Sequence, residues 1–124
     1  MMISQQQMSR MQDARIRTFH DRLRQHLEAE FPQECAELGK ATIKRNVVES
    51  IARASELGIE SERGIVKFVE TAYRLHFHLD RPDLRTWSQR VLASTDLDPV
   101  AKIDHVYDTV RQAWADARRG PQGA

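Results

Sequence analysis

The sequence predicts an all-α protein: a single compact bundle of five to six helices with a long N-terminal helix, occupying residues 1–124 as one domain. Apolar residues recur every three or four positions along almost the whole chain, which is the spacing of one helix face. Proline, glycine and capping residues interrupt this pattern at regular places. No stretch alternates polar and apolar residues between turn signals, so no sheet is expected. Residues 4–118 should be ordered, and 119–124 should form a tail.

The first helix is expected to begin near Ser4, which with Gln7 fits a Ser-x-x-Gln capping box. It should run to about Glu30, where Phe31 and Pro32 close it. A helix of this length measures about 40 Å, whereas a compact domain of this chain length is about 35 Å wide. We therefore expect its N-terminal turns to overhang. The apolar stripe of this helix comprises Met8, Met11, Ile16, Phe19, Leu23 and Leu27.

Two further helices should follow. Pro32 suits the first position of a short helix, and Gly39 suits the left-handed residue that ends it. Thr42 is expected to cap a third helix, which Gly58 ends with a positive φ while Ile59 folds back on it. The residues of the third helix expected to face inward are Val47, Ile51 and Ala54.

Three more helices complete the prediction. Ser61 should cap the fourth, and Pro82 should end it and precede a fifth at about 83–93. Asp98 and Pro99 form a cap followed by proline at the first helical position, which marks the start of the last helix. The expected apolar faces are Ile65, Phe68, Val69, Ala72 and Tyr73, then Leu84, Trp87, Val91 and Leu92, then Val100, Ile103, Tyr107, Val110, Trp114 and Ala117.

Composition argues against several classes of protein. The 19 basic and 18 acidic residues give a net charge of +1, so the chain lacks the basic surface expected of a nucleic-acid-binding protein. The single cysteine cannot form an internal disulfide. No signal-peptide core and no run of about 18–20 apolar residues is visible, so we expect a cytoplasmic protein that does not bind membranes.

One short motif suggests a metal site. His76-x-His78-x-Asp80 matches the start of the metallo-β-lactamase signature, but Arg81 stands where that signature has its next histidine. Residues two apart on a helix point about 200° away from each other, so these histidines could not share a metal ion there. Two ligands alone do not make a site. We expect a helix end and no metal or cofactor, and a metal enzyme built on these histidines is the alternative.

No other motif indicates catalysis. Cys35 has Glu34 and Glu37 beside it, and acidic neighbours raise a thiol pKa, which is the wrong direction for a nucleophile. Phosphate-binding loops and known hydrolase motifs are absent from the sequence. We therefore expect that the chain is not an enzyme. Trp87 and Trp114 lie on apolar stripes and should be core residues, with partner contact as the alternative.

The first helix carries the candidate partner-binding residues: Met8, Met11, Arg15 and Arg22. Methionine is common on adaptable binding surfaces, and arginine suits protein contacts. The alternative is that the methionines pack on a neighbouring helix. Arg10, Arg17 and Arg24, seven residues apart, could also form a nucleic-acid-binding stripe. Because Asp13 and Asp21 interrupt it, a solvated polar face is the better interpretation.

Several segments together carry a resemblance that covers residues 16–110. They include Phe31-Pro32, Gly39, Gly58-Ile59, the helix at 65–73 and Trp87. In these the chain resembles small helical proteins encoded in bacterial type VI secretion clusters. The stretch "HFHLDRP" departs from the Gly-x-Asp-Phe-Asp-like link of that group. The resemblance implies a cytoplasmic adaptor or chaperone that binds a secretion spike, a PAAR-type tip or an effector. A homodimer is the alternative occupant of the surface around Met8 and Met11. The alternatives are an immunity protein that neutralises a cognate toxin and a small nucleic-acid-binding regulator.

Overall fold

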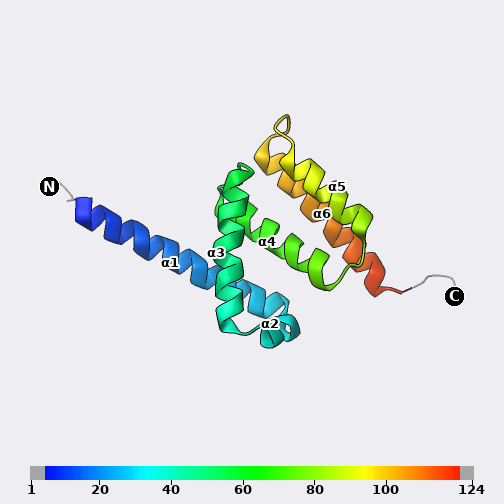
Figure 1. Ribbon diagram of the computed structural model, residues 1–124, viewed down its shortest axis with the longest axis horizontal. Coiled ribbons are helices and arrows are strands. Elements are labelled where there is room, and N and C mark those ends of the chain that lie inside the picture. The colour runs from blue at the N-terminus through cyan, green and yellow to red at the C-terminus, as the bar shows by residue number, and fades with distance from the viewer. Residues whose placement is uncertain (1–4, 121–124) are drawn as a thin grey trace. The chain divides into compact units, whose positions relative to one another are not determined.

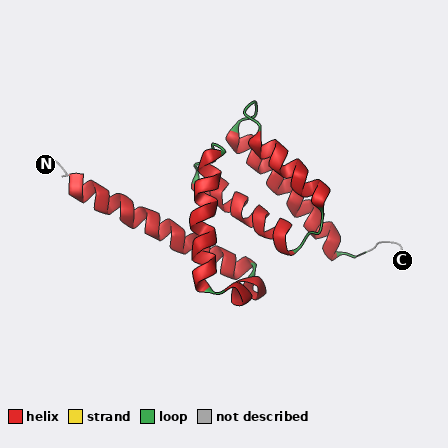
Figure 2. Cartoon of the chain, viewed as in Figure 1, coloured by secondary structure: helices red, strands yellow, loops and turns green. Residues whose placement is uncertain are grey.

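The computed structural model describes residues 5–120, and every regular element in this range is a helix (Figure 2). The all-α prediction is confirmed. The six helices are α1 (Gln5–Glu30), α2 (Pro32–Leu38), α3 (Lys40–Glu56), α4 (Glu62–Phe77), α5 (Pro82–Ala93) and α6 (Pro99–Arg118). None of these helices combines the length and the apolar character that crossing a membrane requires.

The described residues belong to two compact units, and the boundary falls within α3. The first unit ends at Val48 and the second begins at Glu49. In the first unit α1 packs on α2. Its buried apolar side chains are Leu23, Leu27, Phe31, Cys35, Ile43 and Val47. The expectation of one domain over residues 1–124 stays a prediction.

In the second unit α6 is the central helix, because both α4 and α5 pack on it (Figure 1). The apolar residues buried on α4 and α6 recur every three or four positions, as helix packing requires. Lys67 on α4 also forms an ion pair of 2.6 Å with Asp104 on α6. The main buried apolar residues of these two helices are Ile65, Val69, Tyr73, Ile103, Val106 and Val110.

Most of the predicted helix ends are confirmed. The Ser61 side chain accepts a hydrogen bond of 3.0 Å from the Gly64 N–H at the start of α4. The Asp98 side chain accepts one of 3.1 Å from the Ala101 N–H at the start of α6. Gly58 has a φ of +82° and ends α3 in a Schellman turn. In that turn the Ile59 N–H donates to the Ala54 oxygen at 2.8 Å and the Gly58 N–H donates to the Ser55 oxygen at 3.0 Å.

Some details of the prediction differ from the structure, and others agree with it. Thr42 does not cap α3, which begins at Lys40, because Gly39, with φ +84° and ψ 158°, leads the chain directly into the next helix. Helix α5 runs from Pro82 to Ala93, which agrees with the predicted helix at about 83–93. Three residues of the predicted apolar faces, Met11, Ile16 and Val100, are 49%, 53% and 58% exposed. Ser4, half of the predicted capping box, lies outside the described residues.

Candidate functional site

The predicted partner-binding residues lie on one face of α1. Met11, Arg15 and Arg22 are exposed and stand four and seven residues apart, which is the spacing of neighbours on one helix face. Met11 is 49% exposed. Ile16 is 53% exposed and lies about 100° around the helix from Arg15, on the side that continues toward the buried Leu23 and Leu27. The structure does not describe the side chain of Met8. The described N-terminal half of α1 thus presents apolar and cationic side chains to solvent.

The alternative basic stripe of α1 is partly neutralised. Arg24 lies 3.8 Å from the Asp21 carboxylate and 3.5 Å from the Glu28 carboxylate. An arginine held between two carboxylates presents little net positive charge to a phosphate backbone. Arg17 is exposed, and the structure does not describe the side chain of Arg10. This arrangement favours a solvated polar face over a nucleic-acid-binding surface.

The two histidines of the H-x-H-x-D motif have separate surroundings. His76 is exposed on the last turn of α4 and contacts the Phe77 ring edge-on, with ring centroids 4.6 Å apart. His78 follows the end of α4 and stacks on Trp114 of α6 at a centroid distance of 6.1 Å. Within residues 5–120 no group of three or more potential ligands is placed to hold a metal ion. The geometry matches the predicted helix end.

The link between α4 and α5 is held by a local ion pair. The Nε and Nη2 atoms of Arg81 donate to the two carboxylate oxygens of Asp83 at 3.0 and 2.8 Å. The hydrogen bond from Arg81 stabilises the charged carboxylate and lowers the pKa of Asp83 to about 2. This pair, together with Pro82, turns the chain from one helix into the next.

Cys35 is buried in the first unit, where it is 4% exposed. Burial raises the pKa of its thiol, and the nearby carboxylates of Glu28 and Glu34 raise it further. The direction agrees with the sequence-based expectation, although Glu28 rather than Glu37 is the second acidic neighbour. A buried thiol with a raised pKa is a poor nucleophile.

Both tryptophans are half-buried and lie in contact with cationic or aromatic groups. The guanidinium carbons of Arg74 and Arg118 lie 4.4 and 4.6 Å from the centre of the Trp114 ring. Trp87 contacts the ring of His105 edge-on at 5.2 Å. These contacts join α4 and α5 to α6, so each tryptophan has a structural role between helices.

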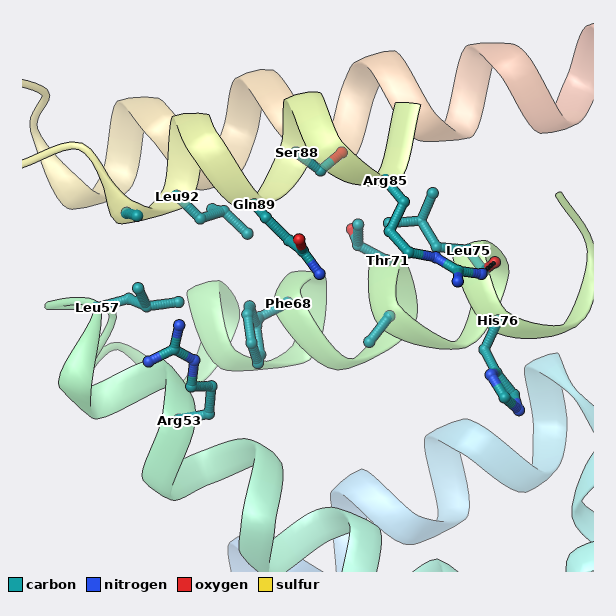
Figure 3. Close-up of a pocket in the computed structure, with 12 residues that line it drawn as sticks. Arg53, Leu57, Phe68, Thr71, Leu75, His76, Arg85, Ser88, Gln89 and Leu92 are labelled. Carbon is teal, nitrogen blue, oxygen red and sulfur yellow. Dashed lines mark hydrogen bonds between the residues drawn. The ribbon is translucent and has the colours of Figure 1, made fainter. Parts of the chain in front are cut away.

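A half-open cavity of about 690 Å³ lies in the second unit, between α4 and α5, and is the candidate site for a small molecule (Figure 3). Its volume lies within the range typical of small-molecule sites. The end of α3 closes one side with Arg53 and Leu57. The two long walls come from α4 and α5, and they contribute Phe68, Thr71, Ala72, Leu75, His76, Arg85, Ser88, Gln89, Leu92 and Ala93.

The lining is mostly apolar, and its ionisable groups are all cationic or neutral. Arg53, His76 and Arg85 are the titratable residues among the lining ones, and no carboxylate lines the cavity. The Arg85 Nη2 donates to the Leu75 carbonyl oxygen at 3.0 Å, which fixes its guanidinium against α4. The cavity can therefore accommodate an apolar group attached to an anionic one.

Sequence patterns indicate only half of this cavity. Phe68 and Ala72 belong to the predicted apolar face of α4. This face holds more apolar residues than one neighbouring helix can cover, and that surplus is the signal of the cavity in the sequence. Ser88 and Arg85 look like ordinary surface positions of a helix in the sequence. Ser88 and Arg85 face α4 because of the way α5 lies along α4. The link between the two helices sets this arrangement.

No family model matches the chain, and neither a curated protein nor a solved structure shows significant similarity to it.

Proposed function

We propose that this chain is a non-enzymatic protein-binding adaptor or chaperone whose first helix contacts the partner. The observation that supports this proposal is the exposure of α1. All seven described side chains between residues 11 and 18 are exposed, including Met11 and Ile16. A helical segment as short as 11–18 is only marginally stable in water by itself. A partner that covers its apolar face would stabilise it.

The chemistry of the face suggests the chemistry of the partner. Arg15 and Arg22 follow Met11 on the same side of α1, about one and three turns later. Interfaces are enriched in methionine and arginine, and arginine pairs well with carboxylates. The partner surface would therefore be apolar and bordered by acidic residues. The resemblance to type VI secretion accessory proteins makes a spike, a PAAR-type tip or an effector the first partner to test.

Changing the methionines to glutamate tests the proposal. The double variant Met8→Glu with Met11→Glu should weaken binding to the co-purifying product of a neighbouring gene by about tenfold or more, because a partly buried apolar anchor is replaced by a charge. Its thermal unfolding should be unchanged. If the variant unfolds, the methionines belong to a core, and the proposed surface is wrong.

A charge reversal with a matched control locates the surface. Arg15→Glu should weaken the same complex, because it places a carboxylate opposite the acidic border of the partner. Arg17→Glu introduces the same change on the same helix about 160° away from this position and should leave the affinity within about twofold. Equal effects of the two variants would show that only net charge matters.

A toxin-rescue assay separates the adaptor from an immunity protein. An adaptor should increase export of its partner without protecting cells that express the toxic domain. Protection by a stoichiometric complex, with no effect on export, would contradict the adaptor role and support neutralisation of a toxin.

A further inference from the structure

We propose that the cavity between α4 and α5 is a binding site for a small amphipathic carboxylate, such as a medium-chain fatty acid. The proposed adaptor function does not use this cavity, since the α1 face belongs to the first unit and the cavity to the second. The two proposals can therefore fail independently. Three features carry the inference: the order of side chains along the cavity, its charge, and two buried hydroxyl groups.

The cavity has an apolar end and a polar end. Helices α4 and α5 run antiparallel along it (Figure 3), so residues late in one lie opposite residues early in the other. Phe68 and Leu92 form the apolar end, which Leu57, the residue after α3, closes. His76 and Arg85 form the opposite end. From residue 68 to residue 76 the cavity follows α4 for about 12 Å, a length suited to a medium alkyl chain.

The distribution of charge indicates where an acid group would bind. Arg53, at the apolar end, forms an ion pair of 2.9 Å with Glu56, so its charge is already balanced. Arg85 donates a hydrogen bond to an uncharged acceptor, the Leu75 carbonyl oxygen. A guanidinium has five N–H donors and readily binds a carboxylate. The head group of the ligand therefore belongs beside Arg85 and the tail beside Phe68.

Two buried hydroxyl groups provide further donors. Thr71 and Ser88 line the cavity and are only 3% and 2% exposed. Neither Thr71 Oγ1 nor Ser88 Oγ has a hydrogen-bond partner among the residues that the structure describes. Such groups are rare because they are costly, and a ligand is one explanation for them. Ser88 lies one helical turn from Arg85, and a change of its χ1 rotamer would let it donate to the same carboxylate.

Titration of the full chain with decanoate tests the proposal. Calorimetry should show saturable binding, and the amide resonances of Phe68, Ala72, Ser88 and Leu92 should shift in NMR spectra. Decylammonium, with the same chain and the opposite charge, should bind at least tenfold more weakly. Equal binding of both compounds, or shifts centred elsewhere, would overturn the site.

Two variants with matched controls show where the carboxylate and the alkyl chain of decanoate bind. Arg85→Gln should weaken decanoate binding about tenfold, whereas Arg90→Gln, at an exposed position of α5 outside the cavity, should not change it. Ala72→Trp should fill the cavity and abolish binding, whereas Ala52→Trp on the exposed side of α3 should bind normally. Thermal unfolding of each variant checks the fold. Undiminished binding by Ala72→Trp would refute the proposal even if Arg85→Gln weakened it.

Discussion

Thr71 places a hydroxyl group in an apolar wall, where it costs stability unless something binds to it. It is 3% exposed, and its oxygen has no hydrogen-bond partner in the described part of the chain. Thr71→Val replaces the hydroxyl by a methyl group of the same shape. We expect the variant to be more stable than the natural protein by about 1 kcal/mol, because a buried unsatisfied group is removed. Thermal or urea unfolding without added ligand measures this.

Thr109→Val is the matched control for Thr71→Val. The Thr109 hydroxyl donates to the His105 carbonyl oxygen at 2.8 Å, so the same change removes a hydrogen bond there. This control should be neutral or slightly destabilised. A Thr71→Val protein less stable than the Thr109→Val protein would mean that the Thr71 hydroxyl is satisfied, and the ligand argument would lose one of its supports.

At the scale of helices, Gly58 determines how α3 ends. Its φ of +82° is unfavourable for residues with a side chain, and a Cβ atom there would lie 3.1 Å from Cγ of Pro99. Gly58→Ala should therefore destabilise the protein by about 1–2 kcal/mol from backbone strain alone, with crowding against Pro99 in addition. Urea unfolding of Gly58→Ala in the presence and absence of Pro99→Ala separates the two contributions. A penalty that is equal in both backgrounds would exclude the contact with Pro99.

Helix ends could be predicted from the sequence because their causes are local. Ser61 and Asp98 each bond an N–H three residues away, and Gly58 acts through its own φ. The predicted cap at Thr42 was wrong because α3 begins at Lys40, directly after Gly39. The second half of the candidate site could not be predicted. The position of Arg85 and Ser88 opposite α4 is set by packing and by the link at 78–81, neither of which has a sequence signature.

At the scale of the whole molecule, burial is distributed unevenly between helices. The described side chains from residue 11 to residue 18 are all exposed, and Leu23 is the first fully buried one among the described side chains of α1. In α4 and α6, by contrast, Val69, Val106 and Val110 have no exposed surface. Regions with few buried contacts open locally at low cost in free energy. The N-terminal half of α1 should therefore be the least protected part of the described helices.

Hydrogen exchange measures this difference directly. Amides of residues 11–18 should exchange orders of magnitude faster than those of Val69, Val106 and Val110, whose exchange requires global unfolding. Leu27, within the buried part of α1, serves as the control on the same helix and should be protected. Adding the partner should slow exchange at 11–18 and leave α6 unchanged.

Strong protection of 11–18 in the isolated protein would contradict the expectation. If that protection rose with protein concentration, a second copy of the chain would be the group that covers Met11, and the homodimer would replace the adaptor complex as the explanation of the exposed face.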